Sequence, residues 1–289
     1  MRRGTTYGNA WMYRALIGLL RRVDRRVFYV LMRTIIIPAQ LPFCPGTRLA
    51  YQYFRHRRGY GRWRAAWCTY LNHCLFGETV IDKFAMYAGR QIKINVTDDT
   101  AYRQMNNQPK PVIQLGAHIG CSEILGYSYY VKKPLNMLVF GGENQPLMQL
   151  RQHQFGEMNI RMIPVGVETS HAQEISDALE RSEIVSAFAD RLMNPRKAVV
   201  STIHGQEVLL AKGPFSLATT RGLPVVMVTA MKEKDGSYTA FMTPLYYDTT
   251  ASQCEQRQQL ADAYTSEIER LLRIYPLQWF NYFDLWKKK

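Results

Sequence analysis

The chain has 289 residues, of which 47% are hydrophobic and 12% aromatic, and its formal net charge is +14. This hydrophobic content excludes an intrinsically disordered protein, and the length allows one large domain or two small ones. The five cysteines are scattered and contain no C-x-x-C pair, which argues against a disulfide framework and a structural zinc site. A reducing, cytosolic setting is the natural inference.

Almost all of the excess positive charge lies in the first 64 residues. This segment holds fourteen arginines, no lysine and one acidic residue, Asp24, and its net charge is therefore +13. Apolar and aromatic runs at 11–20 and 27–43 are interleaved with the arginines. The uninterrupted apolar stretches are far shorter than the roughly 20 residues that span a bilayer, and no small-residue cleavage site follows them. We therefore expect neither a transmembrane helix nor a signal peptide.

Three interpretations of this basic segment stay open. Basic residues beside apolar helical stretches suit an anchor that lies on a membrane surface and faces anionic lipid headgroups. The same pattern fits helices with one solvated face and one face packed on a core. Arginine with aromatic residues also suits nucleic acid phosphates and bases. We favour the membrane interpretation and expect no nucleic acid partner.

Residues 1–100 are expected to be mainly helical and to form the membrane-associating region, and residues 101–289 to form an α/β core continuous with it. Beyond residue 111 short apolar runs alternate with helical patterns, which predicts strands at 112–115, 136–140, 160–165, 184–189, 225–231 and 238–243. We predict helices at 122–130, 146–157, 171–181, 216–220 and 255–274. Residues 232–236 (KEKDG) are typical of a hairpin turn between the last two strands. This alternation predicts a central mixed sheet flanked by helices.

Familiar nucleotide and hydrolase motifs are missing from the sequence. It contains no G-x-G-x-x-G, no G-x-x-x-x-G-K-[ST] and no G-x-S-x-G. No motif in the sequence therefore indicates nucleotide binding or a serine hydrolase of the α/β-hydrolase kind.

A histidine and a glutamate follow the first predicted strand of the core, in the segment GAHIGCSEIL at 116–125. Two residues five apart in one regular helix point about 140° away from each other, so His118 and Glu123 can meet only if the histidine lies in a turn before the helix. Gly116 and Gly120 bracket His118 and permit such a turn. Glu123 would then accept a hydrogen bond from one ring nitrogen and leave the other to take a proton. We predict that His118 is a general base oriented by Glu123; the alternative is a structural histidine.

The segment GAHIGCSE resembles the H-x-x-x-x-[DE] motif of the lysophospholipid acyltransferases. From about residue 10 to its end the chain resembles their lipid A biosynthesis branch, the Kdo-dependent late acyltransferases of Gram-negative bacteria. Three further segments carry the resemblance: 188–191 (FADR) resembles an A-D-[QR] element at a strand end, 204–226 an F-G-x-x-A-x-x-x-x-G-[PT] segment, and 275–280 (YPLQWF) a P-x-Q-[WY] signature. The family's ending often continues to a His-Arg-Arg cluster, whereas this chain reads NYFDLW at 281–286 and becomes basic only at 287–289.

The resemblance implies a glycerol-3-phosphate-acyltransferase-like fold and an acyltransferase of lipid biosynthesis, held peripherally or monotopically on the cytoplasmic face of the bacterial inner membrane. A fatty acyl chain would pass from an acyl carrier protein or coenzyme A thioester to a hydroxyl or amine of a lipid acceptor. Membrane lipids and acyl carrier protein are the implied partners, with no other cofactor and no metal. Because of the changed ending, the acceptor stays open between a lipid A precursor and another lipid, such as an aminoacyl or aryl-polyene lipid.

Four further residues are assigned to substrate binding: Asp190, Arg191, Arg151 and Lys212. Backbone N–H groups near Gly116–Gly120 or a basic side chain could stabilise the oxyanion of acyl transfer. Arg191 is the preferred side chain, because it follows a predicted strand and its guanidinium can bind an anionic group through two N–H groups; a local salt bridge is the alternative. Arg151 and Lys212 are candidates for a phosphate of the acceptor or of the donor's pantetheine, with solvated charges as the alternative.

Two other possibilities remain open for this site. Cys121, inside the motif, is a conceivable thiol nucleophile. A protein of another class, a non-catalytic membrane- or nucleic-acid-binding protein on the same scaffold, is the competing hypothesis, and the intact pair of His118 and Glu123 argues against it.

Overall fold

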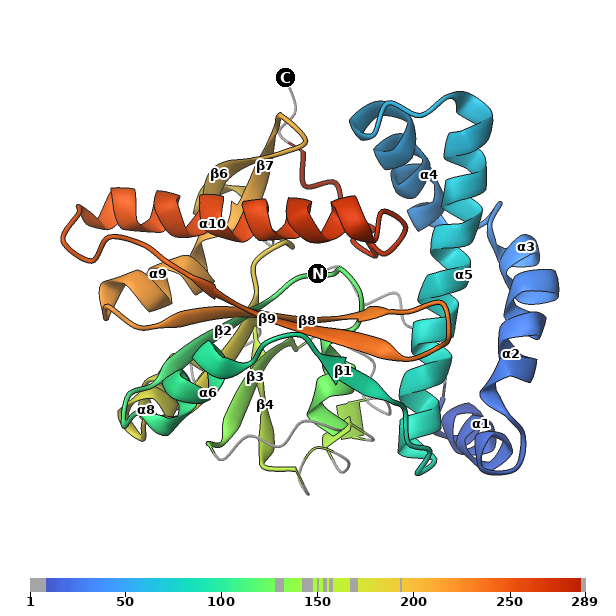
Figure 1. Ribbon diagram of the computed structural model, residues 1–289, viewed down its shortest axis with the longest axis horizontal. Helices are drawn as coiled ribbons and strands as arrows, with labels where there is room; N and C mark the ends of the chain where they lie inside the picture. The colour runs from blue at the N-terminus through green and yellow to red at the C-terminus, as the bar shows by residue number, and fades with distance from the viewer. Residues whose placement is uncertain are drawn as a thin grey trace.

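A mixed seven-stranded sheet forms the centre of the computed structural model, which describes residues 9–127, 133–141, 148–149, 151–152, 155, 158–166, 171–192 and 194–286 (Figure 1). The strand order is β1-β9-β8-β2-β5-β3-β4, and all neighbours are parallel except β8 and β9. The strands are β1 (Ile94–Val96), β2 (Val112–Gly116), β3 (Leu135–Phe140), β4 (Ile160–Val165), β5 (Ile184–Phe188), β8 (Val225–Lys232) and β9 (Tyr238–Leu245).

All six predicted strands are confirmed, and so is the predicted hairpin, which pairs β8 with β9 up to Lys232 and Tyr238. The central strands β2, β5 and β8 are almost continuously buried, which explains why unbroken apolar runs identified them. Three strands were not predicted. β1 has only three residues, and β6 (Ala198–Ile203) and β7 (Gln206–Ala211) pair with each other outside the main sheet. The sheet therefore starts at residue 94, ahead of the expected boundary near residue 100.

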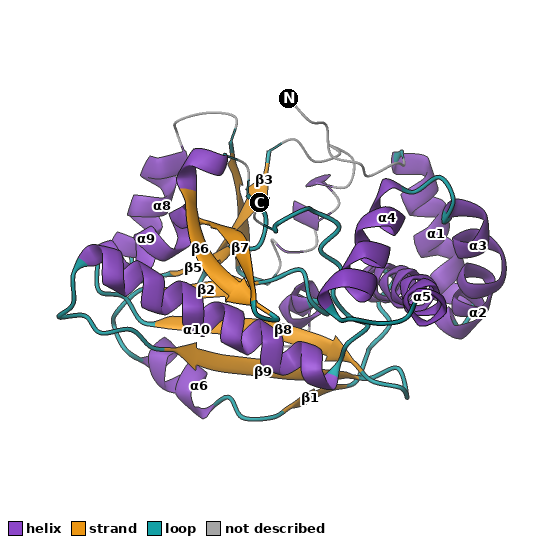
Figure 2. Cartoon of the chain, turned by 90° about the horizontal axis from the view of Figure 1, so that it is seen from above, coloured by secondary structure: helices purple, strands orange, loops and turns teal. Residues whose placement is uncertain are grey.

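Helices cover both faces of the sheet (Figure 2). One face carries α8 (His171–Glu180), α9 (Lys212–Thr220) and α10 (Gln253–Ile274), and the other carries α6 (Thr100–Asn107) and the 3₁₀ helix η3 (Ser122–Tyr127). The predicted helices at 171–181, 216–220 and 255–274 are confirmed. The one predicted at 122–130 is a 3₁₀ helix as far as residue 127, and its remainder, like most of the helix predicted at 146–157, lies outside the described residues.

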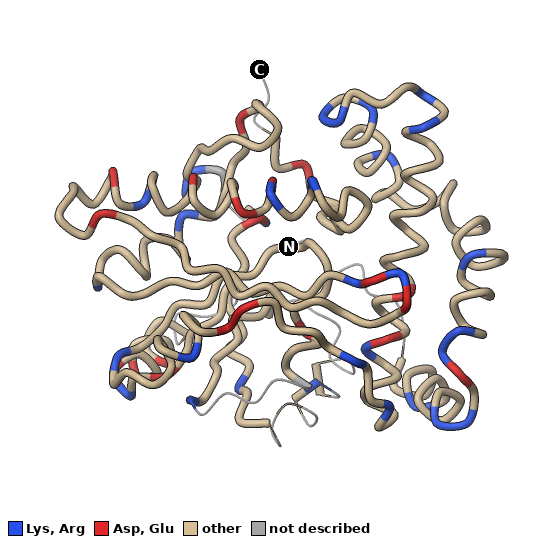
Figure 3. Tube along the Cα trace, viewed as in Figure 1, with Lys and Arg blue, Asp and Glu red and all other residues tan. Residues whose placement is uncertain are grey.

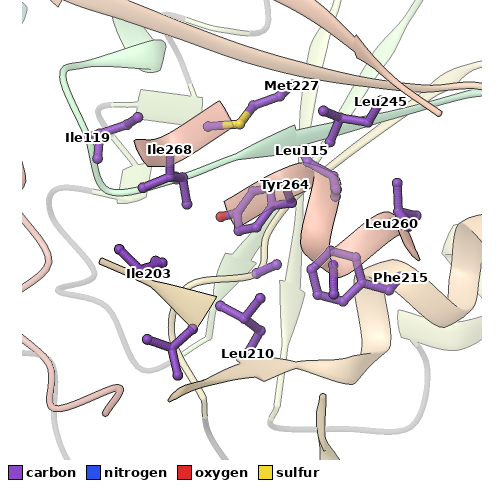
Figure 4. Close-up of a cluster of buried hydrophobic side chains, with 14 of the residues drawn as sticks. Leu115, Ile119, Ile203, Leu210, Phe215, Met227, Leu245, Leu260, Tyr264 and Ile268 are labelled. Atoms are coloured by element: carbon purple, nitrogen blue, oxygen red, sulfur yellow. The ribbon is translucent and has the colours of Figure 1, made fainter. Parts of the chain in front are cut away.

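The larger core lies between the sheet and α10, where Leu115 of β2 meets Phe215 of α9 and Tyr264 of α10 (Figure 4). Tyr264 is fully buried, and its hydroxyl donates a hydrogen bond of 2.8 Å to the carbonyl oxygen of Gly116, the last residue of β2. A buried phenol needs such a partner, because an unpaired hydroxyl in the core is costly. The core thus fixes the point at which the chain leaves β2.

The N-terminal region is helical from Ala10 to Tyr87, apart from short turns, as predicted. It consists of α1 (Ala10–Arg22), α2 (Arg25–Leu31), the π-helix η1 (Met32–Ile36), α3 (Ile37–Gln40), α4 (Pro45–Gln52), the π-helix η2 (Tyr53–Arg57) and the long α5 (Arg62–Tyr87). Figure 1 shows α5 standing beside the sheet, with α1, α2 and α3 on its outer side. Among the described residues no single helix is long and apolar enough to cross a membrane; the segments Arg25–Gln40 and Pro45–Arg57, bent by 97°, meet that test only together.

A buried polar network joins α2 and α5 to the sheet. The carboxylate of Asp82 on α5 is fully buried and accepts hydrogen bonds from Lys232 at the end of β8, from the hydroxyls of Tyr29 and Tyr238, and from Arg25 at 3.1 Å. Lys232 is almost as buried, with 3% of its side chain exposed. Buried charges of opposite sign are tolerated when, as here, hydrogen bonds satisfy both.

This network predicts that the Asp82→Asn protein is strongly destabilised. The substitution removes the charge opposite a buried ammonium group and should lower the free energy of unfolding by about 3 to 5 kcal/mol, measured by urea denaturation in detergent micelles. Asp99→Asn is the matched control, because its ion pair with Arg103 lies where the arginine is 65% exposed, and the cost there should be below about 1 kcal/mol. Equal small losses in both proteins would contradict this account.

Candidate active site

The pairing of β2 with β5 brings His118 and Asp190 together. These neighbouring parallel strands end in register, with Gly116 opposite Phe188. His118 and Asp190 each lie two residues beyond that pair. Nδ1 of His118 lies 2.8 Å from Oδ1 of Asp190, and the backbone N–H of His118 donates to Oδ2 at 2.7 Å. The carboxyl ends of parallel strands are where α/β proteins place their functional groups.

The environment of Asp190 decides which ring nitrogen carries the proton. Burial alone would raise the pKa of the Asp190 carboxyl, but the charge and hydrogen bonds of His118, together with the charge of Arg191, outweigh burial and lower it. The carboxylate is therefore an acceptor only, so Nδ1 of His118 carries a hydrogen, and in the neutral form of the ring Nε2 carries the lone pair. The imidazole is 22% exposed, whereas the Asp190 side chain is 3% exposed, so a buried carboxylate holds a ring that reaches solvent.

Two glycines of the motif are required by close packing. A Cβ atom at Gly116 would lie 2.2 Å from the ring of Phe188, which packs edge-to-face on the His118 ring with centroids 4.8 Å apart. Gly120 has a φ of +56°, and a Cβ there would lie 2.2 Å from the carbonyl oxygen of Ala230 on β8. That carbonyl accepts a 2.7 Å hydrogen bond from the N–H of Cys121. The turn around His118 is thus pressed against both neighbouring strands.

Glu123 does not take the position predicted for it. The carboxylate that holds the His118 ring is Asp190. Glu123, on η3, accepts hydrogen bonds from Lys83 at 3.2 Å and from the hydroxyl of Tyr87 at 3.0 Å, and it forms an ion pair with Arg151, whose Nε lies 3.0 Å away. Lys83 and Tyr87 lie one turn apart on α5 and therefore project toward η3 together. The prediction went wrong because it paired the histidine with the nearest acid in sequence, whereas the sheet brings an acid from 72 residues away.

The charges around Glu123 keep it ionised. Burial would raise its pKa, but Lys83 and Arg151 outweigh burial and lower the pKa to about 2. Glu123 therefore anchors the segment after the His118 turn to α5. Arg151, a candidate for binding a phosphate, forms an ion pair with Glu123, and its side chain is only 11% exposed.

His118 and Asp190 are here called the dyad. Two other residues assigned to substrate binding, Arg191 and Lys212, lie near the end of β5, which carries Asp190. Arg191 follows Asp190 directly; its Nε is 3.4 Å from Oδ1 of Asn281, and its guanidinium lies over the ring of Phe283 at 4.9 Å. Lys212 is exposed at the first residue of α9, directly after Ala211, whose N–H donates to the carbonyl oxygen of Ala189.

Two expectations about the motif itself are also affected by the structure. Burial raises the pKa of Cys121 to about 11, so its thiol is protonated at neutral pH and poorly suited to nucleophilic attack. The backbone N–H groups of His118 and Gly120, considered as oxyanion donors, already donate to Asp190 and to the carbonyl oxygen of Gln278. Among the residues that the structure describes, no group of three or more His, Cys, Asp and Glu side chains could hold a metal ion.

Comparison with known proteins extends over most of the chain. Residues 79–288, which include the dyad and its neighbours, match the model of the family described as bacterial lipid A biosynthesis acyltransferase. Among solved structures the chain is similar to the 1-acyl-sn-glycerophosphate (LPA) acyltransferase PlsC from Thermotoga maritima, with 12% identity, 94% of this chain and 99% of that chain covered, and a TM-score of 0.41. The comparison with curated proteins gave no match.

The low pKa of Glu123 predicts a specific pH dependence of stability. A carboxyl whose pKa falls from 4.5 to about 2 on folding stabilises the protein above pH 4.5, by up to about 3 kcal/mol, and this contribution is lost as the pH falls toward 2. Wild type should therefore be more stable than Glu123→Gln at pH 6, and the difference should shrink toward pH 2, as measured by urea denaturation in detergent micelles. Glu174→Gln, on the exposed side of α8, serves as the control. A difference that is independent of pH would contradict the assignment.

Proposed function

The chain belongs to the bacterial lipid A biosynthesis acyltransferase family, and on that premise we propose that it moves a fatty acyl chain from an acyl thioester to a hydroxyl or amine of a lipid acceptor at a membrane surface. Acyl carrier protein or coenzyme A would supply the thioester. The observation that carries the proposal is the contact between His118 and Asp190, because it orients a partly exposed imidazole through Nδ1 at the carboxyl ends of β2 and β5.

The residues around His118 fit the chemistry of acyl transfer. A neutral alcohol is a weak nucleophile, and an amine must lose a proton as it is acylated, so in either case a base takes a proton during attack on the thioester carbonyl. Nε2 of His118 takes that proton, while Asp190 holds Nδ1 and stabilises the imidazolium. The new C–O or C–N bond forms, the C–S bond breaks, and the departing thiolate receives the proton from Nε2. The products are an ester or amide and a free thiol, and His118 is returned to its starting state.

Arg191 is the side chain proposed to stabilise the oxyanion. It is placed beside the dyad by its position directly after Asp190, and its charge contributes to the lowered pKa of Asp190. A guanidinium near the thioester carbonyl would favour the negative charge that develops on the oxygen. Lys212, which is exposed at the start of α9, is proposed as a contact for a phosphate of the donor or acceptor.

The chemistry of the acceptor is proposed only to the level of a lipid hydroxyl or amine. Residues 281–286 contain no basic residue, and Arg191 contacts Asn281 and Phe283 of that segment. A segment of this kind offers less positive charge to a phosphorylated acceptor than a cluster of basic residues would. An acceptor other than a lipid A precursor, such as an aminoacyl or aryl-polyene lipid, is therefore the second candidate.

A membrane-facing surface on the N-terminal helices would bring the site to its acceptor. Eleven of the exposed large hydrophobic residues among those described lie between residues 11 and 76: Trp11, Met12, Leu19, Val27, Val30, Leu31, Ile35, Phe43, Trp63, Trp67 and Phe76. Figure 3 shows arginines clustered at both ends of these helices. Exposed tryptophans beside arginines suit the interface between lipid tails and anionic headgroups. We propose peripheral or monotopic attachment to the cytoplasmic face of the inner membrane.

The dyad predicts large losses of acyl transfer in two variants. His118→Ala and Asp190→Asn should each lower kcat by about 10² to 10⁴, because one removes the base and the other favours the wrong tautomer. Cys121→Ser should keep most of its activity. The assay follows transfer from acyl carrier protein and coenzyme A thioesters to lipid extracts by mass spectrometry. Turnover like wild type in His118→Ala would overturn the assignment of the base, and loss of activity in Cys121→Ser would favour a covalent route.

The membrane proposal predicts separable contributions from apolar and basic residues. In flotation with vesicles, Trp63→Ala/Trp67→Ala should weaken binding to neutral and anionic vesicles alike, whereas Arg62→Gln/Arg64→Gln should weaken binding to anionic vesicles only, by roughly tenfold or more. Tyr246→Ala is the matched control, because Tyr246 is as exposed as Trp63, at 76%, but follows β9. Equal effects of the tryptophan variant and the control would contradict the proposed surface.

A further inference from the structure

The chain returns to the dyad near its C-terminus through residues 277–283, here called the C-terminal strap. The N–H of Phe280 donates to the carbonyl oxygen of His118 at 2.7 Å, and the carbonyl oxygen of Gln278 accepts from the N–H of Gly120 at 2.9 Å. The strap therefore pairs with the turn that carries the histidine, in the manner of a short antiparallel bridge between Ile119 and Trp279.

Side chains from two other elements hold the strap in place. The amide of Gln278 accepts from the N–H of Lys232 at 2.9 Å and donates to the carbonyl oxygen of the same residue at 2.7 Å, which ties the strap to β8. The amide nitrogen of Asn72 on α5 donates to the carbonyl oxygens of Leu277 and Trp279, both at 2.8 Å. Gln278 is 5% and Asn72 1% exposed, so these bonds are protected from water. The backbone leading to Asn281 is thus held by contacts that do not involve the Asn281 side chain.

From this arrangement we infer that Asn281 is a positioning residue for the His118–Asp190 pair, an inference that rests on the proposed function. Its amide nitrogen donates to the backbone carbonyl oxygen of Asp190 at 2.7 Å and lies 3.3 Å from Oδ2 of the same residue. Its amide oxygen is 3.4 Å from Nε of Arg191. One side chain therefore contacts both the carboxylate that orients the base and the proposed oxyanion ligand.

The hydrogen bonds divide the two oxygens of Asp190 between two tasks. Oδ2 accepts from the backbone N–H of His118 and faces the amide of Asn281, and with that oxygen fixed the carboxylate cannot rotate freely. Oδ1 is then directed at Nδ1 of the imidazole. Partners of this kind, one step removed from the reacting group, commonly set the orientation and basicity of a catalytic side chain.

The charge and the hydrogen-bond donor at residue 281 are therefore expected to affect the pH at which His118 loses its proton. An aspartate in place of Asn281 would add a second negative charge within hydrogen-bonding distance of Asp190 and remove a donor. Both changes favour the imidazolium form, so the ring should hold its proton to higher pH. An alanine would remove the donor without adding charge, and should loosen the carboxylate more than it shifts protonation.

The test is a titration that needs no acceptor. The full chain is labelled with ¹⁵N-histidine in detergent micelles, and the ring signals of the six histidines are followed from pH 5 to 9, with His118→Ala used to assign the His118 signal. In Asn281→Asp the titration midpoint of His118 should rise by about one pH unit. In Tyr282→Phe, which removes a strap hydrogen bond to Asn72 away from the dyad, the midpoint should not move.

Kinetics provide the second measurement and distinguish failure of the positioning role of Asn281 from failure of the proposed function. Asn281→Ala should lower kcat about tenfold with little change in KM, and the acid limb of the pH–rate profile of Asn281→Asp should move upward with the ring titration. An unchanged His118 titration in folded Asn281→Asp, or a shift of equal size in Tyr282→Phe, would overturn the positioning role. If the titration shifts as expected but wild type transfers no acyl chain, or His118→Ala transfers it normally, the proposed function fails while the contact from Asn281 to the dyad stands.

Discussion

The parallel pairing of β2 with β5 is the constraint on which the rest of the site depends. Because Gly116 and Phe188 are opposite each other, the residues two positions further on, His118 and Asp190, meet as the strands leave the sheet. Contacts from three other parts of the chain hold the backbone where it leaves these two strands. Tyr264 holds the carbonyl of Gly116 from the core, Gly120 lets the turn approach β8, and the C-terminal strap closes the far side.

The helix α5 connects this site to the N-terminal helices proposed to contact the membrane. Glu78 and Asp82 lie one turn apart on one face, where they face Lys232 of β8, and Lys83 and Tyr87 lie one turn apart on the adjacent face, where they hold Glu123. The same helix thus carries both buried ionic attachments, one to the sheet and one to the segment that follows His118. The two acidic residues of the site accordingly differ in what they contact: Asp190 holds the ring of His118, the proposed base, and Glu123 holds the segment after His118 to α5.

The sequence predicts six of the seven strands of the main sheet and the position of His118, because buried strands appear as apolar runs and the glycines around His118 mark a turn. It does not predict the partner of His118, because strand order is invisible in a pattern of apolar runs, and Glu123 is nearer along the chain. The signal that existed was the acid at 190, placed two residues after β5 as His118 is placed two residues after β2. Nothing in the composition of the C-terminal strap indicates that Asn281 would return to Asp190, since that contact depends on how Gln278 and Asn72 fix the backbone.

The central claim, that His118 and Asp190 act as one unit in proton transfer, is tested most directly by a double-mutant cycle in kcat. If the aspartate works only through the histidine, the double variant His118→Ala/Asp190→Asn should be no slower than His118→Ala alone, within about twofold, although Asp190→Asn by itself is strongly impaired. If the two losses multiply, so that the double variant is slower than either single variant by the full product, the residues act independently and the account of the dyad is wrong.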